Sequence, residues 1–103
     1  MNQNTILNSL SEELKICIGN NLKKIILYGS QARGEATEGS DYDILVVVDH
    51  ISKELLDNID EIAGEYLFRY DKVFSILPVQ QDRYVKNTFE PFLKNVFYEG
   101  IAL

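Results

Sequence analysis

The most constraining feature of this 103-residue chain is an apolar run, residues 44–48, that follows directly on two aspartates, Asp41 and Asp43. A run that is apolar at every position is typical of a strand covered on both faces, so we place it in the centre of a sheet. Side chains two apart on a strand point to the same face, and the two carboxylates therefore project together. Such a pair is costly to bury unless a cation neutralises it, and Mg²⁺ prefers these oxygen ligands. When an Asp-x-Asp pair stands alone, an ordinary strand start is the commoner explanation.

Helices and strands alternate along the chain. Apolar residues that recur every three or four positions predict helices, and short β-prone runs predict strands. The order is α-β-α-β-α-β-α, in which the second helix is a short turn after Gly29. It indicates a single α/β (α+β) domain over residues 1–103, a small mixed sheet flanked by helices. The expected helices cover residues 6–18, 55–67 and 91–97, and the expected strands cover residues 24–28, 42–48 and 73–79.

Several residues mark where these elements begin and end. Ser52 can cap the middle helix, Pro91 suits the first turn of the last helix, and Gly100 ends that helix. Pro78 cannot donate to a strand ladder, which places the third strand at an edge of the sheet or ends its pairing there. Residues 80–88 are polar and predict an irregular segment or a short turn of helix.

The charge limits the partners of the chain. Ten basic and sixteen acidic residues give a net charge of −6, so the overall field does not attract nucleic acid. The N-terminus lacks the pattern of a signal peptide and the apolar runs are too short to span a bilayer, so we expect a cytoplasmic protein without membrane contact. Cys17 is the single cysteine, and its place in an apolar helical pattern predicts a buried side chain.

A glycine turn precedes the two aspartates. Gly29 lets the backbone approach a ligand closely, and the Ser30 hydroxyl with the following N–H groups can hold phosphate oxygens. On its own, a Gly-Ser pair after a strand is more often a simple tight turn. The pattern is neither a P-loop nor a dinucleotide fingerprint. Arg33, the only cation between Lys24 and Lys53, would either clamp a phosphate or brace an aspartate.

The two segments together carry a resemblance that neither carries alone. Ten residues separate Ser30 from Asp41, and Gly-Ser, a ten-residue spacer and Asp-x-Asp resemble the signature of the DNA polymerase β-like nucleotidyltransferases. The fuller segments, Gly-Ser-Gln-Ala-Arg-Gly and Gly-Ser-Asp-Tyr-Asp-Ile, look like the minimal nucleotidyltransferase (MNT) branch. These are small prokaryotic proteins, some of which are antitoxins paired with HEPN-domain toxins. The resemblance is densest over residues 25–48 and implies the polymerase β-like nucleotidyltransferase fold.

The resemblance also implies a site and an activity. Gly29 and Ser30, together with Arg33, would bind the phosphates of ATP, while Asp41 and Asp43 would be the catalytic residues that hold Mg²⁺. The implied reaction is Mg²⁺-dependent transfer of AMP from ATP to a hydroxyl group of a protein partner. The implied partner is a HEPN-type ribonuclease toxin, neutralised when one of its tyrosines receives AMP.

The chain departs from its active relatives at a third carboxylate. Many of them supply it from a neighbouring strand, whereas residues 73–79 contain no acid and Ser75 stands in the middle of them. Asp71, just before that strand, is the nearest candidate for a weak third metal ligand, although a solvated helix-end residue is the commoner explanation. A catalytically weak or inactive nucleotide-binding antitoxin that neutralises its partner by contact alone is therefore the alternative.

The chain has no room for the second domain with which larger relatives grip the nucleobase and acceptor. A second copy in a homo-oligomer, or a separately encoded protein, would have to complete the site. Transfer to a small molecule is a further alternative, and the missing domain counts against it. Aromatic residues are enriched at interfaces. The aromatic candidates for such an interface are Tyr66, Tyr70, Tyr84, Phe89 and Tyr98.

Overall fold

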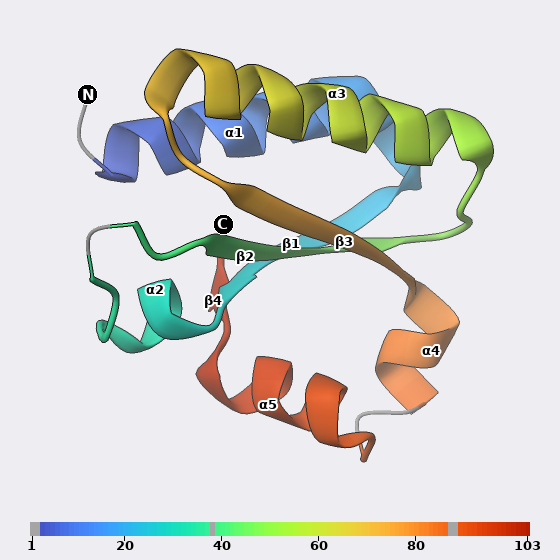
Figure 1. Cartoon of the computed structure of the whole chain (residues 1–103). Coiled ribbons are helices and arrows are strands. Elements are labelled where there is room, and N and C mark those ends of the chain that lie inside the picture. Colours follow the sequence, from blue (N-terminus) through green and yellow to red (C-terminus); the bar gives the residue numbers. More distant parts are fainter. Residues whose placement is uncertain (1–2, 38, 87–88) are drawn as a thin grey trace.

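The computed structural model describes residues 3–37, 39–86 and 89–103 and contains one mixed four-stranded sheet (Figure 1). The strands are β1 (Leu22–Tyr28), β2 (Tyr42–Val48), β3 (Phe74–Gln80) and β4 (Ile101–Ala102), in the order β3-β2-β1-β4. β2 pairs parallel with β3, whereas β1 pairs antiparallel with both β2 and β4. The prediction that β2 is central is confirmed, and Pro78 lies on the edge strand β3, where its missing donor is tolerated.

Helices cover both faces of the sheet (Figure 1). On one face lie α1 (Gln3–Ile18), which ends in the short 3₁₀ turn η1 (Gly19–Asn21), and α3 (Lys53–Tyr70). On the other lie α4 (Gln81–Lys86) and α5 (Pro91–Glu99), and α2 (Ser30–Arg33) is the turn that follows β1. As predicted, the Ser52 side chain caps α3 by accepting from Leu55 N–H, and Pro91 begins α5. In the part of the chain that the structure describes, no helix combines the length and apolarity needed to cross a membrane.

The side chains of β2 divide the core into two layers. Ile44, Val46 and Val48 belong to the cluster under α1 and α3, whereas Leu45 and Val47 belong to the cluster under α4 and α5. All five are buried, which explains why the run is apolar at every position. Because side chains alternate along a strand, the odd-numbered residues at the start of β2 face the same side as Leu45.

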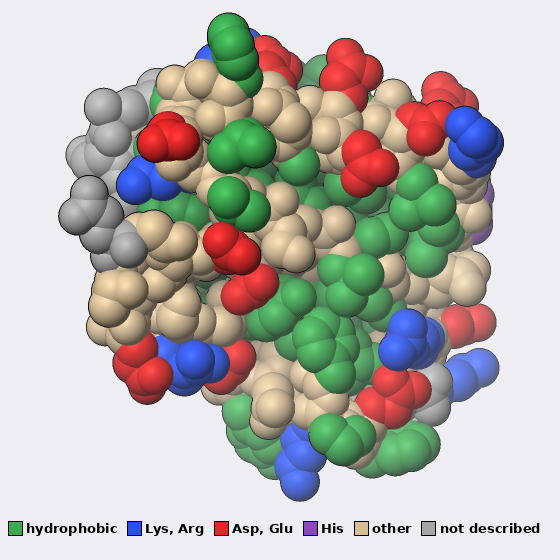
Figure 2. Space-filling model, viewed as in Figure 1, with side chains coloured by type: hydrophobic (Ala, Val, Ile, Leu, Met, Phe, Trp, Pro, Cys, Tyr) green, Lys and Arg blue, Asp and Glu red, His purple; other side chains and the backbone are tan. Residues whose placement is uncertain are grey.

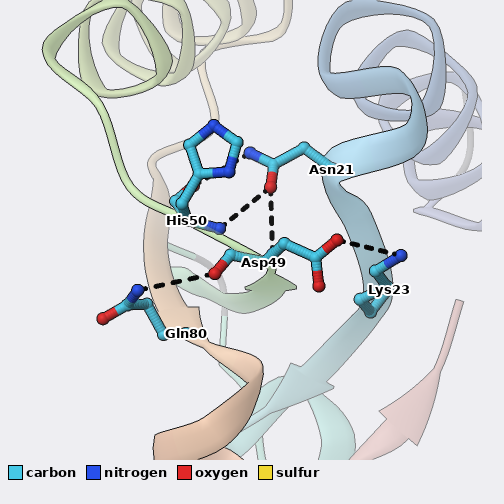
Figure 3. A network of polar contacts seen from close by, with 5 residues as sticks. All are labelled: Asn21, Lys23, Asp49, His50 and Gln80. Carbon is cyan, nitrogen blue, oxygen red and sulfur yellow. Dashed lines mark hydrogen bonds and ion pairs between the residues drawn. The ribbon is translucent and has the colours of Figure 1, made fainter.

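The end of β2 farthest from the aspartates is closed by a polar network (Figure 3). Asn21 Oδ1 accepts from the N–H groups of Asp49 and His50, both at 3.0 Å, and Asn21 Nδ2 donates to His50 O at 2.9 Å. Lys23 Nζ lies 3.1 Å from Asp49 Oδ2, and Gln80 Nε2 donates to Asp49 O. His50 is thus a loop residue that contributes its backbone, and the network ties β1, β2 and β3 together at one end.

Two expectations about side-chain burial need correction. Cys17 is exposed, because it lies in the last turn of α1, where an open groove separates that helix from α3. Among the aromatic residues proposed for an interface, Tyr66 and Tyr84 are buried in the two core layers, whereas Phe89 and Tyr98 are about three-quarters exposed. Tyr70 is partly buried against the ring of Tyr66.

Candidate functional site

Three strands bring polar side chains together at one end of the sheet. In the pairing of the strands Tyr28 lies opposite Asp43, and Asp43 lies beside Ser75. Directly paired residues project from the same face of a sheet, and Asp41, just before the start of β2, lies close enough for its charge to raise the pKa of Asp43. Asp43 is partly buried and Asp41 is exposed, so the carboxylate pair reaches from the edge of the core into solvent.

The turn after β1 packs directly onto this pair. Gly29 has φ +79° and ψ −160°, a conformation open mainly to glycine, and a Cβ at this position would collide with Oδ2 of Asp43. Its carbonyl accepts from the N–H groups of Ala32 and Arg33, both at 3.1 Å, which forms the single turn of α2. Ser30 is the first residue of α2, and its hydroxyl therefore lies at the start of that turn, next to the residue in contact with Asp43.

Glu99, at the end of α5, is a site residue that sequence reasoning missed. Its Oε1 accepts from Gly29 N–H at 3.0 Å and its Oε2 accepts from Arg33 Nη1 at 2.9 Å. The ion pair with Arg33, and then the bond from Gly29, lower the pKa of the Glu99 carboxyl. No local pattern marks Glu99, since its partners lie 66 and 70 residues earlier in the chain.

The electrostatics of the pair favour a cation. Burial raises the pKa of Asp43 above its ordinary value, and the neighbouring charges of Asp41 and Glu99 raise it further, whereas Arg33 lowers it. The pKa of the Tyr28 hydroxyl is also raised, first by burial and then by Asp43. An ionised Asp43 therefore places a second negative charge beside that of Asp41, which is unfavourable until a cation compensates it.

Arg33 braces the turn in this structure. Besides its bond to Glu99, its Nε donates to Glu35 Oε2 at 3.3 Å. Of the two roles open from the sequence, the structure shows the guanidinium paired with carboxylates, and its charge acts on Asp43. Gln31 fastens the other side of the turn by donating from Nε2 to Ser40 O at 3.2 Å.

Asp71, the candidate for a weak third metal ligand, lies at the end of α3, and that role stays a prediction. It caps the C-terminus of α3 in a left-handed conformation, φ +53°, with its N–H bonded to Leu67 O at 3.0 Å. β3 begins at Phe74 opposite Tyr42, so the position beside Asp43 falls to Ser75. Among residues 3–37, 39–86 and 89–103, no three acidic, histidine or cysteine side chains come together as a metal group.

An apolar surface borders the site (Figure 2). On the face shown, hydrophobic side chains gather over β3 and the neighbouring α4 and α5, with acidic side chains at their margin. The Phe92 ring meets the Tyr28 ring edge to face, 5.5 Å between centroids, which links this surface to the residue opposite Asp43. The large hydrophobic residues of these elements that are exposed in the described part of the chain are Leu77, Val85, Phe92, Phe97 and Tyr98, and Phe89 lies exposed between α4 and α5.

Comparison with protein families gives one match over nearly the whole chain. The model of the family described as nucleotidyltransferase domain matches residues 4–103. A protein of Methanocaldococcus jannaschii, named provisionally as a protein adenylyltransferase, is 33% identical over 103 residues, which are 100% of this chain and 99% of that protein. A second protein of the same organism, with the same provisional name, is 39% identical over 65% of this chain and 48% of its own length.

Comparison with solved structures agrees with the fold. A chain in a toxin–antitoxin structure with AMP-PNP superposes with a TM-score of 0.68 at 20% identity, over 98% of this chain and 72% of its own. A structure of tri-AMPylated Shewanella oneidensis HEPN toxin in complex with an MNT antitoxin gives a TM-score of 0.65 at 20% identity, over 98% of this chain and 71% of the matched one. The predicted fold, a small mixed sheet flanked by helices, is thereby confirmed.

Proposed function

The chain belongs to the nucleotidyltransferase domain family, and from that premise we propose that it transfers AMP from ATP to a hydroxyl group of a separately encoded protein. The observation that carries the proposal is the contact between Gly29 and Asp43, which puts a turn suited to phosphate beside a pair of carboxylates suited to a cation. The names of the two Methanocaldococcus relatives support protein as the acceptor class.

The residues present fit a bound Mg²⁺. Burial, and then the neighbouring charge of Asp41, raise the pKa of Asp43, and a bound cation would offset both effects. Mg²⁺ usually takes one or two protein carboxylates and completes its shell with phosphate oxygens and water. When bound, it would supply charge neutralisation on the triphosphate and lower the pKa of an attacking hydroxyl.

The remaining roles fall to the turn. The Ser30 hydroxyl and the first N–H groups of α2 would hold the terminal phosphates, because the first N–H groups of a helical turn have no acceptor within it. The acceptor oxygen then bonds to the α-phosphorus, pyrophosphate leaves with the former bridging oxygen, and the hydroxyl proton passes to water. Positioning and charge stabilisation do most of the work in such transfers.

The partner we propose is a HEPN-type toxin. Two solved structures that share this fold are toxin–antitoxin assemblies, one of them described as a tri-AMPylated HEPN toxin with an MNT antitoxin. The apolar surface formed by β3, α4 and α5 lies on the same side of the sheet as Asp43, so a protein seated there would present its hydroxyl to the site.

Labelling of the partner tests the proposal. The chain is purified with the product of the gene beside its own and incubated with Mg²⁺ and ATP labelled at the α-phosphate. Label on the partner with the wild type, and none with Asp41→Asn or Asp43→Asn, is the expected result. Equal labelling by wild type and both variants would refute the roles given to the aspartates.

A second candidate function has its own observation. Ser75 stands beside Asp43 where an acid would complete a trio, which favours an antitoxin that neutralises its partner by contact. This candidate predicts that the double variant Asp41→Asn/Asp43→Asn still suppresses toxicity in cells. Toxicity that returns while the complex remains intact would rule it out.

A further inference from the structure

We propose that Glu99 is a positioning residue that holds the Gly29 turn at a set distance from the aspartate pair. This inference rests on the proposed function, because it assumes that the turn binds phosphate. Glu99 lies outside the Gly-Ser and Asp-x-Asp segments, and its carboxylate bonds to the turn rather than to the aspartates.

One carboxylate spans both ends of the turn. Oε1 accepts a hydrogen bond from the N–H of Gly29, the residue before α2. Oε2 accepts one from Nη1 of Arg33, the last residue of α2. Bonds to an ionised carboxylate are about twice as strong as neutral ones, and two of them from one side chain fix direction as well as distance. The side chain of Glu99 is 22% exposed and that of Arg33 is 41% exposed, so the partly buried bond to Gly29 N–H is better shielded from water than the ion pair.

The backbone that carries Glu99 is itself held firmly. Leu93 and Val96 bury α5 against the sheet, and Gly100 N–H bonds to Val96 O at 2.8 Å. Directly afterwards β4 pairs with β1 through Ile101 opposite Leu27, and Leu103 N–H reaches Ile25 O at 2.9 Å. Figure 1 shows the end of α5 and β4 beside the end of β1, from which the turn departs.

Gly29 therefore lies between two carboxylates. Asp43 touches its Cα side, and Glu99 binds its N–H. If the Glu99 side chain is removed, Gly29 loses the hydrogen bond that holds it against Asp43, and Arg33 loses its shortest ion pair. The turn can then shift away from the aspartates, so the phosphates are held less well while the aspartates themselves are intact. The loss should appear in ATP binding and in KM before it appears in kcat.

Tighter ATP binding after removal of Glu99 would indicate a different role for this residue, and the same experiment tests it. A carboxylate on a backbone N–H and an arginine could act as a phosphate mimic that ATP must displace. Its removal would then tighten ATP binding, whereas loss of a positioning residue weakens it. The direction of the change in affinity decides between them.

Three variants make the test. Glu99→Gln keeps an acceptor for Gly29 N–H but loses the ion pair, Glu99→Ala loses both, and Glu90→Gln removes a comparable pair, with Arg83 at 3.0 Å, at the other end of α5. With Mg²⁺ and ATP, we expect Kd and KM to rise about tenfold in Glu99→Gln and further in Glu99→Ala, since one charge-assisted bond corresponds to about this factor. We expect kcat to fall by less than about threefold in Glu99→Gln, and Glu90→Gln to match the wild type.

Hydrogen exchange separates this inference from the proposed function. In the free protein, the Gly29 amide should be protected in the wild type and in Glu99→Gln and should exchange faster in Glu99→Ala. If the wild type transfers no AMP, the proposed function fails, and the Gly29 exchange rate and the Kd for ATP still decide the role of Glu99. Unchanged Gly29 exchange in Glu99→Ala, or an ATP affinity that stays the same or increases in Glu99→Gln, would overturn the inference.

Discussion

Ser75 lies directly beside Asp43 in the parallel pairing of β2 and β3, and its side chain projects from the same face. This places an exposed, uncharged residue at the position of β3 from which a third carboxylate would stand beside Asp43. We therefore propose that the activity of the chain depends on the two aspartates, or on a group that the partner provides.

Ser75→Asp should strengthen metal binding. A third carboxylate beside Asp43 adds an oxygen ligand and negative charge, so the Kd for Mg²⁺, or for Mn²⁺ as a probe, should fall by about tenfold or more. Calorimetric titration measures it, and Ser75→Asn provides an uncharged control of the same shape. Equal metal affinity in Ser75→Asp and Ser75→Asn would mean that position 75 does not face the site.

Gly29→Ala should disable the site through sterics. The new Cβ meets Oδ2 of Asp43 and the backbone is at φ +79°, so the loss of folding free energy should exceed the roughly 1–2 kcal/mol of a left-handed residue alone. Gly34→Ala is the matched control, because φ is +73° there and no atom lies within 4 Å of the added Cβ. Thermal melting and ATP titration should show a larger loss at position 29, and equal losses at both positions would contradict the packing of Gly29 on Asp43.

Asp43→Asn should stabilise the metal-free protein while removing its metal response. Because the folded pKa of Asp43 is raised, the folded state binds protons more readily than the unfolded state, and stability falls as pH rises from the ordinary aspartate pKa through the raised value. At neutral pH and without metal, the variant should therefore have the higher Tm. Adding Mg²⁺ should raise the Tm of the wild type only.

Two results for Asp43→Asn would contradict this prediction. A Tm below that of the wild type across the range from acid to neutral pH would show that ionised Asp43 is stabilising. An equal rise in Tm with Mg²⁺ in both proteins would place the metal away from Asp43.

Asn21→Ala should weaken the fold without touching the chemistry. The side chain makes three hydrogen bonds to Asp49 and His50, at the end of β2 opposite the aspartates. We expect a loss of about 1–3 kcal/mol, which for a domain of this size lowers Tm by several degrees. ATP affinity measured well below the melting range should match the wild type, and a loss of affinity there would mean that the two ends of the sheet are coupled.

The parts of the site that are local in sequence could be predicted from it. The Asp-x-Asp spacing at the start of β2 predicts a pair of carboxylates, and the strand that precedes Gly29 predicts a tight turn there. Both features depend on a few consecutive residues. The central position of β2 follows in the same way from an apolar run that only two helical layers can cover.

The parts that depend on distant contacts could not. Glu99 reaches the turn because β4 folds back onto β1, a pairing of two residues that no periodicity signals. Asp71 is the acid nearest in sequence to the predicted third strand, but the register of β2 and β3 selects Ser75. Cys17 fits the apolar pattern of α1, but it lines an open groove between α1 and α3 and is exposed.

The intact mass of the partner, after co-expression with this chain, tests the central claim most directly. We expect one or more mass increments equal to added AMP when the wild type is present, and none with the double variant Asp41→Asn/Asp43→Asn, although both form the complex. A partner of unmodified mass in a stable complex with the wild type would contradict transfer to protein, and the chain would then act on its partner by binding alone.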